Sequence, residues 1–124
     1  MKKIWSLAAV VLVVAIAGVP ACSKKSDKTT NPPPAKELNS AALANGAMYV
    51  HTFNTVGVFP YHCSIHPSMT GTVTVTSGGP TTPLAIGITL ATGFNPASPT
   101  VGVGTIVTWT NNDASNSHTV TSDP

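Results

Sequence analysis

The sequence predicts an all-β fold, a two-sheet β-sandwich, for the chain from Leu38 onward, and three observations carry this prediction. Val, Thr, Ile and aromatic residues are frequent there, Gly, Pro and Asn interrupt them at short intervals, and no stretch keeps a helical period. Short strands with one apolar face bury that face by stacking as two sheets. A domain of roughly 90 residues buries only about 60–65% of its unfolded surface.

Alternation along the expected strands sorts their side chains onto two faces. Phe59, Tyr61 and Cys63 share one face of their strand, whereas His62 points to the opposite face. A connection rich in Gly and Pro then separates a first set of strands from a second set. We expect strands at 47–53, 58–63, 71–76, 84–91, 105–110 and 118–122, and a shorter one near 100–103.

The first 21 residues have the pattern of an export signal. Two lysines follow Met1, an apolar run comes next, and Val19-Pro20-Ala21-Cys22 resembles a bacterial lipobox. We therefore expect a lipoprotein signal peptide at 1–21, with Cys22 lipidated and the protein anchored to a bacterial membrane on the periplasmic or cell-surface side. Ser23 favours the outer membrane where a cell has two. A plain secretory signal or an uncleaved anchor is the alternative, although the run is short for a membrane span.

Residues 22–37 are polar and contain three consecutive prolines, which predicts a disordered, semi-stiff tether between the lipid and a domain at 38–124. All six lysines precede Leu38, the chain has no arginine, and Asp113 and Asp123 are the only formal charges from Leu38 onward. The domain therefore lacks a basic surface, and we expect no nucleic-acid partner.

The most informative motif is Cys63-Ser64-Ile65-His66-Pro67-Ser68-Met69, which puts a thiol, an imidazole and a thioether on one short loop. Soft sulfur together with nitrogen selects copper over cations that prefer oxygen. A trigonal copper site with a weak axial Met needs a second imidazole, and His118 is the best candidate. If Cys22 is lipidated, Cys63 has no disulfide partner, and a metal would occupy its thiol. Each of these residues alone is more often core filler or surface; the joint spacing favours a site.

Two other histidines compete for the role of second imidazole. His62 neighbours Cys63 and points to the other face, so we expect a surface position for it. His51 lies in a strand well before the loop, where we expect a structural role. The polar residues ahead of His118 are expected to form turns rather than to bind metal; they are Asn111, Asn112, Asp113 and Asn116.

The region from Leu38 onward resembles the cupredoxins, most closely the branch of plastocyanin and amicyanin. Residues 59–69, followed by Gly71-Thr72-Val73, resemble the C-terminal half of that family. Similarity to its N-terminal half lies in Phe94-x-Pro96, in 101–105, in 107–111 and in His118-Thr119-Val120, the last resembling the segment with the first copper histidine.

The two halves stand in the reverse of the family order. The resemblance therefore implies a Greek-key β-sandwich of the cupredoxin type with permuted strand order, in which 38–76 is the family's C-terminal half and 84–124 its N-terminal half. The linker at 77–83 can span up to ~23 Å, which makes the join sterically easy. The alternative is a fragment of a tandem array, in which half-domains are completed by strand exchange between two chains in a dimer.

The resemblance further implies a type 1 blue-copper electron-transfer protein, a one-electron shuttle that docks transiently with redox proteins. We expect no enzyme, because a site filled by protein ligands leaves no position for a substrate. A copper-binding or delivery protein would need an open Met- or His-rich site, and a metal-free surface module would have lost its ligands. Implied copper ligands are Cys63, His66, Met69 and His118; Ser64 would hydrogen-bond toward Thr119; and Pro67, Phe94 and Pro96 would form an electron-entry patch, unless Phe94 packs in the core.

Overall fold

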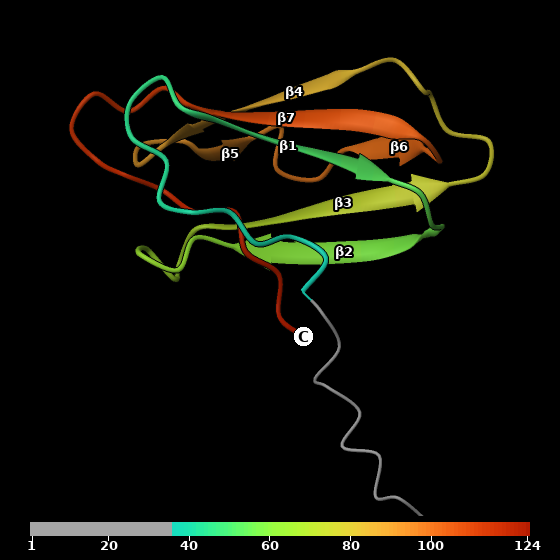
Figure 1. The fold of residues 1–124 in the computed structure, drawn as a ribbon, viewed down its shortest axis with the longest axis horizontal. Helices are drawn as coiled ribbons and strands as arrows, with labels where there is room; N and C mark the ends of the chain where they lie inside the picture. The colour runs from blue at the N-terminus through green and yellow to red at the C-terminus, as the bar shows by residue number, and fades with distance from the viewer. Residues whose placement is uncertain (1–35) are drawn as a thin grey trace, which may run out of the picture. The chain divides into compact units, whose positions relative to one another are not determined.

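The structure is a computed structural model that describes residues 36–124 (Figure 1). This range contains β-strands and no α-helix, so the predicted all-β fold is confirmed. Accordingly, within these residues no helix is long and apolar enough to cross a bilayer. The strands are β1 Met48–Phe53, β2 Gly57–His62, β3 Thr70–Thr76, β4 Leu84–Thr89, β5 Gly93–Asn95, β6 Thr100–Gly102 and β7 Thr105–Asn111.

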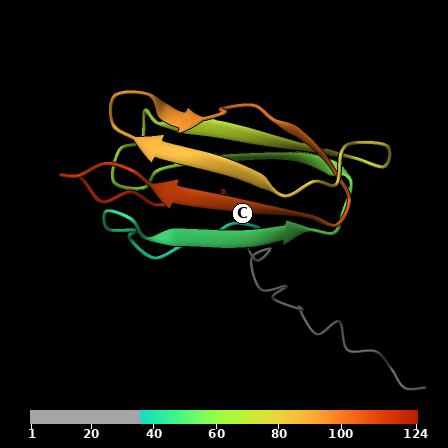
Figure 2. The same ribbon diagram turned by 90° about the horizontal axis from the view of Figure 1, so that it is seen from above.

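The strands form two mixed sheets that lie as layers in Figures 1 and 2. One sheet has the order β1-β7-β4-β5, with β1 antiparallel and β4 parallel to β7. The other has the order β2-β3-β6, with β2 antiparallel and β6 parallel to β3. Each sheet therefore combines strands from both sides of the 77–83 connection.

Inward-facing residues of both sheets build a single core. Val73, Val75, Val107 and Trp109 are all buried, as the alternation along their strands predicts. The Tyr61 ring lies between the layers and meets Trp109 nearly edge-on, with ring centroids 5.6 Å apart and an angle of 85°. Aromatic contacts of this kind add stability beyond the buried area and fix the spacing of the sheets at the β2 end.

Gly71 is required by the ring of Tyr61. The two residues are directly opposite one another in the β2–β3 pair. A Cβ added at Gly71 would lie closer than 3.0 Å to carbon and oxygen atoms of that ring. The tyrosine therefore covers the glycine across the ladder, and the close approach holds β2 and β3 in one register.

Residues 38–43 and 118–122 lie side by side and extend the second sheet without forming regular strands. The Leu43 N–H donates to the His118 carbonyl (2.7 Å) and the His118 N–H to the Leu43 carbonyl (3.1 Å). On its other side, Thr121 exchanges two backbone hydrogen bonds with His62 at the end of β2. Leu38 is fully buried, so the packed part of the chain includes the first residue expected in the domain.

The strand expected at 118–122 is thus reduced to isolated bridges. Serine hydroxyls take over part of the ladder: Ser40 Oγ accepts from the Val120 N–H (2.8 Å), and Ser122 Oγ accepts from the Leu38 N–H (3.0 Å). Such side-chain bonds compete with regular pairing. The structure also adds β5, which the sequence did not indicate, and it ends β2 one residue before Cys63.

The 77–83 connection packs closely against β6. The Pro80 carbonyl accepts hydrogen bonds from the Gly102 N–H (2.7 Å) and from the Thr105 hydroxyl (3.0 Å). A Cβ at Gly79 would collide with the backbone of Val101. The connection is therefore a fitted turn with its own hydrogen bonds.

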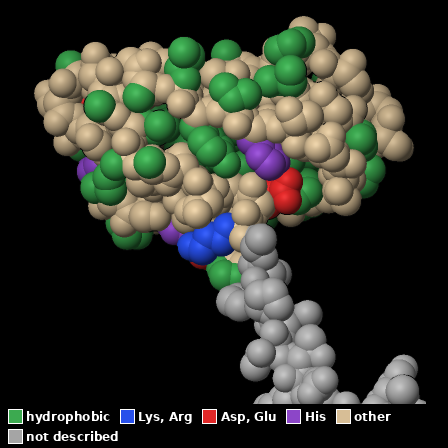
Figure 3. All heavy atoms as spheres, in the orientation of Figure 1, with side chains coloured by type: hydrophobic (Ala, Val, Ile, Leu, Met, Phe, Trp, Pro, Cys, Tyr) green, Lys and Arg blue, Asp and Glu red, His purple; other side chains and the backbone are tan. Residues whose placement is uncertain are grey.

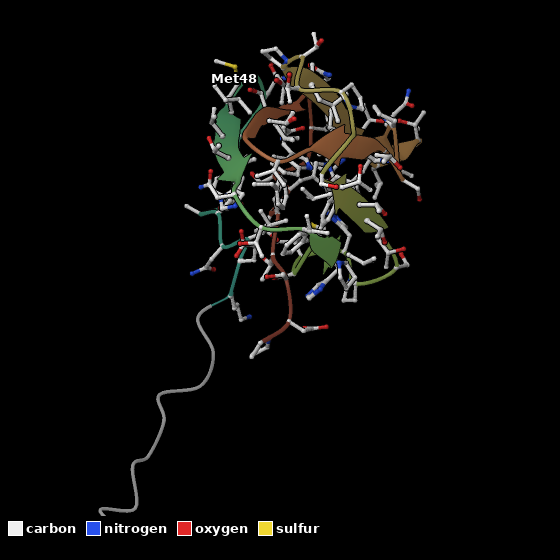
Figure 4. The ribbon with its side chains drawn as sticks, turned by 90° about the vertical axis from the view of Figure 1, so that its right-hand side faces the viewer. Met48 is labelled. Carbon is white, nitrogen blue, oxygen red and sulfur yellow. The ribbon has the colours of Figure 1, made fainter. Side chains whose placement is uncertain are left out.

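Charged side chains are sparse on the surface. In Figure 3 they gather where the described chain begins, and the rest of the visible face is apolar or uncharged. There Glu37 accepts a hydrogen bond from the His51 ring at 2.7 Å. Met48 on β1 is 64% exposed and points outward (Figure 4), so it is not part of the buried core.

Candidate metal centre

The loop at 63–69 connects β2 to β3 at one end of the sandwich. The Cys63 N–H donates to the Met69 carbonyl (3.0 Å), which closes the base of the loop. The Met69 N–H donates to the His66 carbonyl (2.9 Å), which folds the chain back inside it. Because β2 and β3 are antiparallel neighbours, a hairpin of this length returns His66 toward Cys63.

His118 reaches the loop from a distant part of the chain. Its backbone is fixed by the paired hydrogen bonds with Leu43, and its side chain is fully buried. The segment that follows it pairs with the end of β2, immediately before Cys63. These two backbone attachments bring an imidazole next to the thiol.

Three potential ligand atoms converge at this point. Cys63 Sγ lies 3.6 Å from Nδ1 of His66 and 3.8 Å from Nδ1 of His118. The ligand atoms of the three residues all lie within 4.8 Å of one another. The two imidazole rings are adjacent, with centroids 4.8 Å apart.

This arrangement can hold a metal ion. Bonds of about 2.0–2.3 Å, as zinc makes with histidine nitrogen and cysteine sulfur, place three trigonal donors about 3.5–4 Å apart. The two distances to Cys63 Sγ fall in that range. Cys63 and His118 are buried and His66 is partly buried, so water competes little for the ion.

The environment of Cys63 favours the thiolate that a metal requires. Burial raises the pKa of this thiol, but the Thr119 N–H and the His118 and His66 rings that hydrogen-bond to the sulfur have the larger combined effect. The net result is a Cys63 pKa lowered to about 6. The Thr119 N–H lies 3.3 Å from the sulfur and aims its positive end at the thiolate charge.

Further hydrogen bonds connect the loop to the His118 segment. The Ser64 backbone N–H donates to Thr119 Oγ1 at 2.7 Å, so the contact between these two residues uses the serine backbone. The Ser64 hydroxyl donates instead to Thr121 Oγ1 at 3.2 Å. Both contacts hold the 63–69 loop and the His118 segment at a fixed separation.

Asp113 is the residue near the site that sequence reasoning missed. Its Oδ2 atom lies 3.4 Å from Nε2 of His118. Hydrogen bonds from the Leu90 N–H, then from the Ser115 N–H, outweigh burial and hold the pKa of this carboxyl well below its usual range. The only signal in the sequence was an acidic residue five positions before His118, in a segment whose Asn and Ser content predicts turns.

Of the other residues expected at the site, two are buried in the core and two are exposed on the surface. Met69 is buried directly before β3, among the core residues. Phe94 is buried as well, with its ring 4.7 Å from that of Tyr61, so it has the core position that was the alternative to a surface patch. Pro67 and Pro96 are exposed.

His51 and His62 lie outside the cluster. The His51 ring contacts Glu37 and the edge of Phe53. His62 is partly exposed, and its Nδ1 atom lies 3.9 Å from a carboxylate oxygen of Asp123. Among the described residues, Cys63 is a buried free cysteine.

The export signal expected at 1–21, the expected lipidation site Cys22 and most of the tether expected at 22–37 lie outside the described residues. Comparisons of the chain with protein-family models, with curated proteins and with solved structures returned no match. The Cys63, His66 and His118 cluster and the fold that positions it are therefore the observations from which function is inferred.

Proposed function

We propose that this protein is a type 1 blue-copper electron-transfer protein, a one-electron shuttle. Cys63, His66 and His118 would hold one copper ion, with Met69 as a weak axial ligand. The observation that carries the proposal is the convergence of one sulfur and two imidazole nitrogens within 4.8 Å. A His2Cys set is the trigonal ligand list of blue-copper sites, and it suits copper better than magnesium or calcium.

Copper, when bound, supplies one-electron chemistry by alternating between Cu(I) and Cu(II). The chain's contribution is to keep the donor atoms in place. The backbone bonds that close the loop at Cys63 and Met69, together with those that pin His118 to Leu43, resist movement of the ligands. A fixed ligand geometry lowers the reorganisation that opposes electron transfer.

His66 is the most accessible of the three clustered ligands, since Cys63 and His118 are buried. We infer that electrons enter through its exposed edge. Pro67, next to it, and Pro96 offer uncharged surface for a redox partner. The Ala97 carbonyl accepts from the Thr72 N–H (2.8 Å), so Pro96 lies beside the end of β3 that carries the loop. A small apolar contact suits transient docking.

The proposed fold is a permuted cupredoxin sandwich closed within one chain. Its support is that residues 38–76 and 84–124 each contribute strands to both sheets: β1 pairs with β7, and β3 pairs with β6. The two segments at which a permuted chain would have been opened, 38–43 and 118–122, are hydrogen-bonded to each other. Lipid anchoring through Cys22, on the outer face of a bacterial membrane or in the periplasm, belongs to the same proposal.

One equivalent of Cu(II) added to the purified chain tests the function. The expected result is an intense blue absorption in wild type that Cys63→Ala removes, with one copper per monomer by native mass spectrometry. A colourless adduct, or rapid loss of copper to a mild chelator, contradicts the shuttle, and the second result favours copper delivery. A blue dimer with no blue monomer contradicts closure within one chain.

The lipid anchor is tested with radiolabelled palmitate. We expect the label to be incorporated into wild type but not into Cys22→Ala.

A further inference from the structure

We propose that Asp113 is a positioning residue for the copper site: its carboxylate orients the His118 ring and lowers the reduction potential of the bound metal. This inference rests on the proposed function, because it concerns His118 as a ligand. It adds a residue that neither the motif nor the resemblance assigned to the site.

The first step is the geometry of the His118 ring. Its Nδ1 atom faces Cys63 Sγ at 3.8 Å, and its Nε2 atom faces Asp113 Oδ2 at 3.4 Å. A proton on Nε2 that is donated to the carboxylate leaves the lone pair of Nδ1 directed at the metal position. The ring is fully buried, so solvent does not compete with Asp113 for that proton.

The second step is that the carboxylate cannot turn away. Oδ2 also accepts from the Leu90 N–H (2.9 Å), in the turn after β4. Oδ1 accepts from the N–H groups of Ser115 (3.0 Å) and Asn116 (3.1 Å), and the side-chain amide of Asn116 donates to both oxygens. Three backbone N–H groups and one side-chain amide therefore fix both carboxylate oxygens. These bonds keep Asp113 Oδ2 in place beside the His118 ring.

The third step is the charge. Asp113 is only 12% exposed, so its negative charge is poorly screened. A fixed anion beyond the ligand stabilises Cu(II) more than Cu(I), because the oxidised ion carries one more positive charge. From Leu38 onward the only other formal charge is Asp123, so few other charged side chains offset the effect of Asp113 on the metal.

The experiment compares Asp113→Asn with Asp123→Asn in the full chain loaded with copper. Asp123 is 84% exposed and lies beside His62, so its variant removes the same charge at a site open to solvent. For Asp113→Asn we expect a shift toward Cu(I) of about tenfold or more in relative affinity, equivalent to a potential higher by about 59 mV for one electron. Asp123→Asn should shift it by less than half as much. Equal shifts in the two variants, or no shift, overturn the proposal.

A second control separates orientation from support of the loop. The Asn111 amide donates to the carbonyls of Leu43 and Asn116, and its oxygen accepts from the Asp113 N–H. Asn111→Ala therefore removes hydrogen bonds that support the loop around Asp113, but it leaves the Asp113 carboxylate present. We expect its potential to stay close to wild type, and a rise equal to that of Asp113→Asn contradicts a role beyond support.

The copper-free protein gives a readout that does not depend on the metal. A thiolate at Cys63 would itself favour a proton on Nδ1 of His118, so the measurement uses copper-free Cys63→Ala, with and without Asp113→Asn. In ¹⁵N-resolved NMR at neutral pH, His118 should be the tautomer protonated at Nε2 in Cys63→Ala, and this preference should weaken when Asp113→Asn is added. An Nδ1-protonated ring in Cys63→Ala, or no change on adding Asp113→Asn, overturns the inference. If wild type fails to form a blue copper complex, the proposed function fails instead, and the tautomer still decides whether Asp113 orients His118.

Discussion

Cys63 Sγ and His118 Nδ1 lie 3.8 Å apart, although 55 residues separate them in the chain. The thiol stands at the end of β2, and the imidazole precedes the segment that pairs with β2 through Thr121 and His62. Folding therefore assembles the candidate site. Any ion held there bridges the two halves of the domain, so binding and stability are coupled.

Copper should stabilise the fold. An ion that binds only the native state adds about 2.7 kcal/mol when its free concentration is 100 times the dissociation constant. We expect thermal unfolding of wild type to move upward with copper, with little change for Cys63→Ala. A copper-induced shift of equal size in Cys63→Ala would place the bound ion elsewhere.

Gly71→Ala should destabilise the domain by about 1–3 kcal/mol, because the added methyl forces the Tyr61 ring out of the core. The matched control is Gly78→Ala, whose Cβ meets nothing within 4 Å and which should change stability by no more than about 0.5 kcal/mol. Urea denaturation measures both. Similar values for the two variants would contradict the tight Tyr61–Gly71 contact.

Tyr61 should make stability depend on pH in the alkaline range. Burial raises the pKa of its hydroxyl to about 12, above the value near 10 of an unfolded chain. A folded-state pKa raised in this way gives a contribution that is fully present below pH 10 and lost as the pH rises from 10 to 12. The unfolding free energy of copper-free wild type should therefore fall in this window by about 2–3 kcal/mol more than that of Tyr61→Phe. Parallel profiles for the two proteins would contradict a buried, un-ionised hydroxyl.

A circularly permuted variant, with its new termini at Gly78 and a short Gly-Ser linker from Ser122 to Leu38, should fold and form the same copper site. Leu38 and Ser122 exchange backbone and hydroxyl hydrogen bonds, so only a few residues are needed to join them. The cut at Gly78 leaves the close contact between Gly79 and Val101 intact. The visible spectrum of the copper complex, compared with wild type, is the measurement. Loss of the site in a folded re-opened chain would contradict the permuted arrangement.

Local pattern predicted much of the fold. The strands around Val73 and Val107 were recognisable because side chains on a strand alternate between two faces. The segment after His118 was expected as a strand but pairs only through bridges, since hydroxyls such as Ser40 Oγ take over backbone hydrogen bonds. β5 escaped notice because three residues carry too little pattern.

The sequence by itself determined the all-β class and the grouping of Cys63 with His66. Both follow from short-range spacing: alternation defines strand faces, and a tight loop between antiparallel strands keeps its members near one another. Only the tertiary structure decided which imidazole completes the cluster, that Phe94 packs in the core, and that Asp113 lies behind His118. Those relationships depend on strand pairing between residues far apart in the chain, and pairing is set by the packing of the whole sandwich, which no local spacing encodes.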